Sequence, residues 1–223
     1  MKKKLVMVMI STMLVASLMA CGSKKNESGK ANTKTEQSAN NTDTKDAKKT
    51  EEKELSYDTI KDYPETKASD FETFPTTYDS ENASITDIGS YNGSDKVVVI
   101  PSEIDGKKVT EIDKLAFGNN ETVEGIVVPD TVEYIRNSAF ANCENLKYVV
   151  LSKNLKAIEE GVFVNTGIKE ITFPGTLSDV GANGEGLLGL QGATINVESG
   201  VSDNILGFLN AGKDTLKWTI VQK

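Results

Sequence analysis

Short aliphatic runs alternate with polar segments at a nearly constant interval between residues 97 and 190. The runs read VVVIP, GIVVP, YVVLS and EITFP, and isolated aliphatic residues follow within each polar segment. Because alternate side chains of a strand face opposite sides, each run predicts a strand with one buried face. A unit of about two dozen residues cannot cover that much apolar surface alone, so the repetition predicts stacked units that share one core.

Three phenylalanines set the period of this stack. They stand 23 residues apart, and each follows an isoleucine by five positions. We expect these side chains to form the structural core of the return arms, the segments that lead from one strand to the next: Phe117, Phe140, Phe163, Ile112, Ile135 and Ile158. The strands should point a further set inward: Val98, Ile126, Val149 and Ile171, and beside them Ile100, Val128, Leu151 and Phe173.

Asparagine recurs at the same period, two positions after each phenylalanine, as Asn119, Asn142 and Asn165. Asparagine side chains often bond backbone groups in turns. We therefore expect each amide to bond the backbone at its own corner of the stack.

These motifs resemble one known class of repeat. A strand ending in Ile-Pro or Val-Pro, then Val-x-x-Ile, Ala-Phe and Asn-Cys, is similar to the BspA-like leucine-rich-repeat proteins, and IVVPDTVEYIRNSAFANCENLKYV is the fullest unit. The resemblance covers about residues 84–190. It implies a β-rich repeat solenoid with short helical turns, carried by bacterial surface proteins, some of which adhere to host or partner surfaces.

The first 20 residues predict an export signal. Three lysines precede an apolar run that ends at Ala20, and Leu18-Met19-Ala20-Cys21 resembles the bacterial lipobox. The resemblance implies cleavage after residue 20 and a lipid on Cys21, which would hold the protein on the outer surface of a bacterial cell membrane. A secreted protein cut after Ala20 and an uncleaved signal anchor are the alternatives.

Three further segments surround the repeats at 97–190. Residues 21–70 are assigned to a disordered tether, because the stretch as far as Glu54 is rich in Lys, Asn, Thr, Glu and Ser and poor in large apolar residues. Residues 55–82 are intermediate, since aromatic residues appear there among acidic ones, and part of this stretch should dock. Residues 71–96 predict an N-terminal β cap, with strands over 71–78 and 83–88 and a hairpin signal at Asn92-Gly93.

Residues 191–223 predict a C-terminal cap. A strand over 195–197, a short helix around 202–210 and a strand over 217–221 should close the stack. Leu187 and Leu188 replace the missing Ala-Phe turn just before it. Trp218 fits packing within the cap better than a platform for a ligand.

Composition narrows the chemistry. The formal charge is −8, and it becomes −11 once a leader with three lysines is removed, which argues against nucleic acid as a partner. Histidine is absent, so the usual general base and the commonest nitrogen ligand for a metal are missing. Cys143 is the only cysteine besides Cys21. Cys143 is expected to be an inert core residue.

No cofactor, metal or catalytic group is predicted. The glycines from Gly184 to Gly189 match GxGxxG formally, but a strand-like segment follows them in place of the long helix that a dinucleotide fold requires. No calcium-binding spacing of acidic residues is present. The sequence therefore favours a protein that is not an enzyme.

With no catalytic group predicted, the candidate functional site lies on the surface of the stack. Val99, Val127, Val150 and Thr172 should point outward from the strands, flanked by Glu124, Lys147, Tyr148, Lys169 and Glu170. Contiguous apolar patches often mark interaction sites, so this column is a candidate binding face for an extracellular protein or glycan. Strand propensity alone, or coverage by a neighbouring strand or subunit, would explain the valines equally well.

Two functions remain open at this point. One is a lipid-anchored, adhesion-type binding module at the cell surface. The other is a structural envelope component that packs with other surface proteins and has no external ligand.

Overall fold

The computed structural model describes residues 54–75 and 85–223, all within one compact unit that spans Thr50–Lys223. The predicted leader, Cys21 and the tether as far as residue 53 lie outside the described residues. So do residues 76–84, which include parts of two predicted strands.

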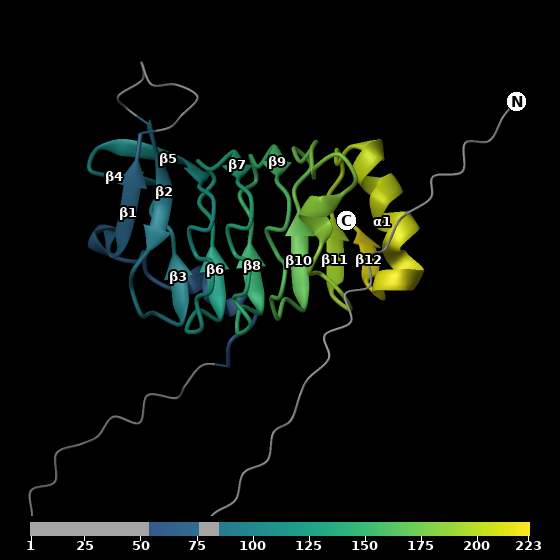
Figure 1. Cartoon of the computed structure of the whole chain (residues 1–223), viewed down its shortest axis with the longest axis horizontal. Helices are drawn as coiled ribbons and strands as arrows, with labels where there is room; N and C mark the ends of the chain where they lie inside the picture. The colour runs from purple at the N-terminus through teal and green to yellow at the C-terminus, as the bar shows by residue number, and fades with distance from the viewer. Residues whose placement is uncertain (1–53, 76–84) are drawn as a thin grey trace, which may run out of the picture. The chain divides into compact units, whose positions relative to one another are not determined.

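A six-stranded parallel sheet runs through the described unit (Figure 1). Its strands follow the predicted aliphatic runs and continue beyond them, so the sheet crosses residue 190 without a break. In spatial order they are β3 (Val97–Val99), β6 (Gly125–Val127), β8 (Tyr148–Val150), β10 (Glu170–Phe173), β11 (Thr194–Val197) and β12 (Thr219–Gln222).

A second sheet forms from the return arms, and the sequence did not predict it. Three of its strands are only two residues long, which is too short to give a periodic pattern. Its members are β1 (Phe71–Phe74), β2 (Ile85–Tyr91), β4 (Glu103–Ile104), β5 (Lys107–Ile112), β7 (Tyr134–Ile135) and β9 (Ala157–Ile158). β1 pairs antiparallel with β2, and β4 with β5; the other pairs are parallel.

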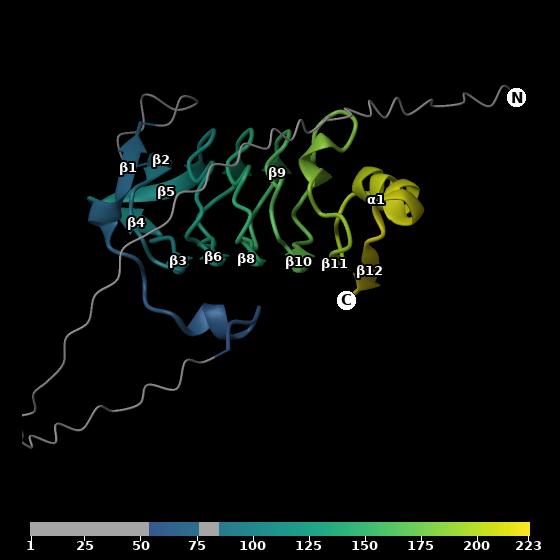
Figure 2. The same cartoon turned by 60° about the horizontal axis from the view of Figure 1, so that its bottom comes forward.

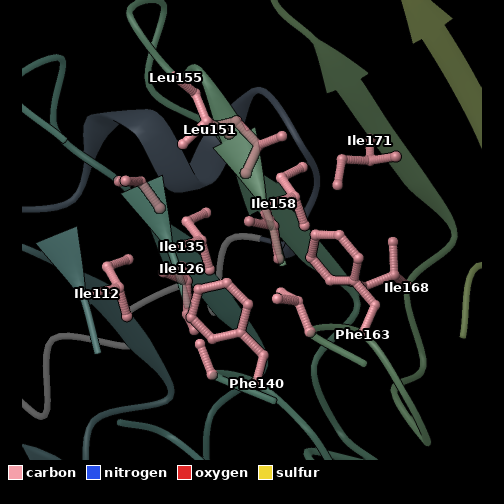
Figure 3. Close-up of a cluster of buried hydrophobic side chains, with 14 of the residues drawn as sticks. Ile112, Ile126, Ile135, Phe140, Leu151, Leu155, Ile158, Phe163, Ile168 and Ile171 are labelled. Carbon is pink, nitrogen blue, oxygen red and sulfur yellow. The ribbon is translucent and has the colours of Figure 1, made fainter. Parts of the chain in front are cut away.

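The core between the two sheets is the predicted one. Every predicted inward strand residue is buried, and so are the three phenylalanines and three isoleucines of the return arms. Figure 3 shows part of this set, with Phe140 and Phe163 among the isoleucines. The ring centroids of Phe117 and Phe140 lie 5.5 Å apart, and those of Phe140 and Phe163 lie 6.1 Å apart. Tyr91 and Phe71 extend this column at 5.3 Å per step, which the sequence reading missed.

The asparagine column is real, but its predicted bonding was wrong. All three residues adopt left-handed backbone angles, with φ of 62°, 61° and 55° at Asn119, Asn142 and Asn165. Their amides do not bond the backbone but bond each other from one stacked repeat unit, or rung, to the next. Asn142 Nδ2 donates to Asn119 Oδ1 at 2.9 Å, and Asn165 Nδ2 donates to Asn142 Oδ1 at 2.8 Å. Equal positions in successive rungs lie close enough for side chains to bond, and this favours the ladder.

The predicted extent of the tether was also wrong. Residues 54–70 form part of the compact unit and contain two 3-10 helices, η1 (Thr59–Asp62) and η2 (Ala68–Asp70). Ile60 of η1 is fully buried. The aromatic residues of 55–82 indicated that part of this stretch would dock, but a single isoleucine among polar residues carries no periodic signal, so docking through Ile60 could not be predicted.

The hairpin predicted at Asn92-Gly93 does not form. β2 and β3, on either side of it, belong to different sheets. Tyr91 packs in the aromatic column and Asn92 N donates to Asp70 O at 2.8 Å, so this segment carries the chain from one sheet to the other.

The C-terminal elements agree with the prediction in kind. The helix α1 (Asp203–Leu216) is longer than expected, and β12 follows it. Trp218 is buried, and its Nε1 donates to Leu209 O at 2.8 Å, as packing within a cap requires. Leu187 is buried as predicted, but Leu188 is 41% exposed and does not fill the core.

None of the described helices has the length and apolar content needed to cross a bilayer.

Candidate binding face

The predicted outward column exists. Register places Val99, Val127 and Val150 side by side on β3, β6 and β8, and the pairing of β8 with β10 brings Thr172 next to them. All four are half-buried rather than fully exposed. The row continues to Asn196 and Val221, which the sequence reading did not include.

A second outward row lies two residues earlier on the same strands, at Val97, Gly125, Tyr148 and Glu170. Val97 and Gly125 are buried although they face outward. The cover is Ile60: a β-carbon placed on Gly125 would lie 3.0 Å from Ile60 Cγ2 and 3.6 Å from Val97 Cγ2. Gly125 therefore leaves a notch in the face, and Ile60 fills it.

Residues 54–67, called the strap from here on, cross the N-terminal part of this face. Figure 2 shows η1 lying over the parallel sheet on the side away from the core. At the edge of the sheet Thr66 N donates to Val99 O at 2.9 Å, and Val99 N donates to Thr66 Oγ1 at 3.1 Å. The outward face of the parallel sheet is therefore covered in part by the strap. The sequence suggested a neighbouring strand or subunit as the cover, but not this segment.

Between the strap and the strands lies a groove of about 880 Å³. This volume is in the range of sites that hold small molecules or side chains of a partner. Four of the five predicted flanking residues line it: Glu124, Lys147, Tyr148 and Lys169. The fifth, Glu170, is outside it and accepts a hydrogen bond from Asn196 Nδ2 at 2.8 Å.

Ion pairs organise the strand side of the groove. The carboxylate of Glu124 bonds Lys147 Nζ at 3.0 Å and Lys96 Nζ at 3.2 Å. The hydrogen bond from Lys147, followed by that from Lys96, lowers the pKa of Glu124 below its usual value. Lys169 is exposed, and among the residues that the structure describes it has no ion-pair partner. This lysine lies just before β10 and is available to an acidic group.

A smaller hollow of about 410 Å³ lies on the second sheet, around Arg136. Arg136 bonds Glu111 at 2.6 Å and Glu159 at 2.8 Å, and so links three successive rungs. Burial opposes its charge, but these two bonds outweigh that effect and raise the pKa of Arg136. Its charge is already compensated within the protein, which makes this cluster a clamp between rungs.

The residues with catalytic potential are placed as core or turn residues. Cys143 is buried, its Sγ lies 3.0 Å from Phe117 O, and desolvation raises its pKa to about 11, so the thiol is neutral at physiological pH. In the part of the chain that the structure describes, no group of three His, Cys, Asp or Glu residues could hold a metal ion. The segment Gly184–Gly189 contains η3 (Glu185–Leu187) and leads into β11.

Comparison with known families now adds to the geometry. The profile of the BspA type leucine rich repeat region matches residues 80–184, in six copies. The chain belongs to the BspA type leucine-rich-repeat family. This assignment agrees with the strands, the aromatic column and the asparagine ladder described above.

Solved structures of leucine-rich-repeat proteins resemble this BspA type chain. A protein of T. pallidum is 20% identical, with a TM-score of 0.50 over 64% of this chain and 78% of its own. One from Bacteroides capillosus is 31% identical, with a TM-score of 0.40 over 42% of this chain and 74% of its own. A leucine rich cell surface protein from Faecalibacterium prausnitzii is 20% identical, with a TM-score of 0.50 over 62% of this chain but only 35% of its own. No curated protein matches the chain.

Proposed function

We propose that this protein is a non-enzymatic binding module at the outer surface of a bacterial cell, and that it recognises an extracellular protein or glycan through the strand face of its solenoid. The groove between the strap and the strands carries this proposal. It combines apolar, aromatic and charged groups in one concave site, among them Val97, Tyr148 and Lys169. The row of half-buried valines follows two residues further along the same strands. Interfaces are enriched in tyrosine for this reason, since the ring contributes contact area and the hydroxyl can bond.

The surface location rests on two independent supports. The lipobox-like Leu18-Met19-Ala20-Cys21 favours lipid attachment at Cys21 and retention on the membrane. One protein of the same fold is described as a cell surface protein. Metabolic fatty-acid labelling tests the anchor directly: label should be lost in Cys21→Ala, and label that persists in this variant would contradict the assignment.

A structural envelope component is the second candidate. The half-buried valine row favours it as well, because the same surface could pack against another envelope protein. The two functions differ in the partner, which is external in the first and part of the cell's own envelope in the second.

A capture experiment with two classes of bait separates them. The full chain, purified in mild detergent and immobilised, is exposed to extracellular matrix proteins and a glycan array on one side, and to the solubilised envelope of the producing cell on the other. The proposed function predicts capture from the first class, and Val127→Glu should abolish it because a buried charge would face the partner.

The matched control is Val164→Glu, which changes a half-buried valine at a turn away from the strands. This variant should bind as the wild type does. Capture from the envelope alone would favour the structural role, and equal loss in both variants would mean that the strand face has no special part in binding.

A further inference from the structure

We propose that the strap is a displaceable internal occupant of the binding face, and that the external partner of this face is an acidic segment that carries a branched aliphatic side chain. The inference rests on the proposed function and specifies the chemistry of the partner. It follows from how the strap is held, from what it covers and from its charge.

The notch at Gly125 is the centre of the argument. The strand positions on either side of it in the row carry valine and tyrosine, so only Gly125 leaves room for a side chain that comes from outside. Ile60 occupies this room and is fully buried there. Ile60 is nevertheless outside the core cluster, which begins at Phe71. The contact is therefore a docking contact on the outer face, formed by a segment far from Gly125 in the sequence.

The strap has the character of a docked peptide. Its helical turn is organised by its own residues, because Ser56 N donates to Thr59 Oγ1 at 2.8 Å and Thr59 N donates to Ser56 Oγ at 3.2 Å. Lys61 pairs with Asp58 at 3.1 Å and lies 4.3 Å from the centre of the Tyr57 ring. At the sheet edge its described backbone bonding is confined to Thr66 and Val99. Ile60 is the only buried apolar side chain of the strap and lies outside the core cluster, so the strap can leave without disturbing the core.

The net charges of the strap and of the strand side of the groove indicate the charge of the partner. The strap contains four acidic residues and two lysines, so it is net negative. The strand side of the groove carries three lysines, Lys96, Lys147 and Lys169, against Asp95 and Glu124, so it is net positive in a chain whose overall charge is −8. An acidic segment is therefore favoured on this face, whether it is the strap or part of another molecule.

Competition between the two occupants has a measurable consequence. An external segment binds only the fraction of molecules in which the strap has left, so its apparent affinity is reduced by that fraction. A weaker strap should raise the apparent affinity without any change in the face itself. A filled notch should prevent binding whatever the strap does.

The probe is a fluorescent peptide with the sequence of residues 54–67, added to the full chain in mild detergent and followed by anisotropy. The protein variant Ile60→Ser weakens the strap and leaves the core cluster untouched, so the peptide should bind it about tenfold or more tightly than the wild type. The same peptide carrying Ile60→Ser is the control ligand and should not bind. Melting temperatures of all variants report whether they fold.

The decisive control is the double variant Ile60→Ser, Gly125→Val. The three atoms nearest to a β-carbon at Gly125 are side-chain atoms of Ile60 and Val97, and the closest, at 3.0 Å, belongs to Ile60, so the strand accepts valine once Ile60 is shortened to serine. This variant should fold and lose peptide binding. Equal peptide affinity for the wild type and for Ile60→Ser, or retained binding in the double variant, would overturn the proposal. If the wild type captures an external partner while the peptide fails to bind Ile60→Ser, the proposed function stands and the role of the strap is wrong.

Discussion

Phe140 lies between two other phenylalanine rings, one from the rung before it and one from the rung after it. Its side chain is completely excluded from solvent. Phe140 thus contributes to two interfaces between rungs, and a change at this residue affects both neighbours. The same dependence on neighbours holds for Cys143, whose sulfur contacts the carbonyl group of Phe117 in the preceding rung.

We expect Phe140→Ala to reduce the free energy of unfolding by roughly 3–5 kcal/mol, because it removes a large buried side chain and leaves a cavity between two rings. Urea denaturation followed by circular dichroism measures this. Phe74→Ala is the control, since Phe74 is 45% exposed and its loss should change stability far less. Equal effects of the two substitutions would place Phe140 outside the core.

The raised pKa of the Cys143 thiol predicts that the free energy of unfolding decreases at high pH. Its pKa is about 11 in the folded chain, against an ordinary value of 9.0, because burial disfavours the thiolate. The unfolded chain therefore releases this proton first, and stability present below pH 9 falls as the pH rises toward 11, by about 2–3 kcal/mol in total. The pKa of Tyr91 is raised by burial as well, so the measurement is a difference between variants.

The comparison is between the wild type and Cys143→Ala, by urea denaturation at several pH values from 8 to 11.5. The alanine variant should show a flatter decline over this interval. Identical slopes would mean that Cys143 does not remain a neutral thiol in the folded chain.

At the scale of elements, the corner of each rung is defined by two columns of left-handed residues. One is the asparagine ladder, and the other runs through Leu115, Ser138, Gly161 and Gly184. Asparagine adopts this conformation more readily than most residues, and its amide also joins the ladder. Backbone conformation and cross-rung bonding thus favour the same residue at Asn142.

The two contributions can be separated at Asn142. Asn142→Ala loses both ladder bonds and strains the left-handed backbone, and we expect a cost of about 2 kcal/mol. Asn142→Gly loses the same bonds but accepts the backbone angles, and should cost about 1 kcal/mol or less. Thermal denaturation of the two variants measures the difference. If alanine and glycine destabilise equally, backbone strain has no part in the choice of asparagine.

At the scale of the whole described unit, one core cluster extends from Phe71 to Trp218. β1 and β2 close one end of it with Phe71 and Tyr91, and α1 with Trp218 closes the other. Stacked repeats need such ends, because a terminal rung would otherwise expose its core. A continuous core without a break between caps and repeats favours a single unfolding transition.

The only tryptophan in the chain is Trp218, so its fluorescence reports on the C-terminal end alone. We expect its urea midpoint to coincide with that of circular dichroism at 218 nm, which reports on all the strands. Phe140→Ala should shift both midpoints equally, although Phe140 lies in a different rung. A fluorescence midpoint that stays in place while the other moves would show that the C-terminal end unfolds independently.

The amino-acid sequence by itself determined the repeat, its period and the inward side chains. These depend on local alternation within a strand and on a spacing that recurs from rung to rung, so each can be read along the chain. The outward valine column and four of the groove residues, Glu124, Lys147, Tyr148 and Lys169, could be predicted for the same reason, since the register of stacked equivalent strands follows from the period.

Only the tertiary structure decided which segment covers the outward face of the strands and which groups bond at the corners of the rungs. The contact of Ile60 with Gly125 joins two positions far apart in sequence, and neither residue belongs to a pattern that marks it in advance. The addition of Tyr91 to the aromatic column and the amide ladder likewise depend on which groups meet across rungs. A period predicts that segments stack, whereas the partner of an isolated side chain depends on the shape of the surface that it meets.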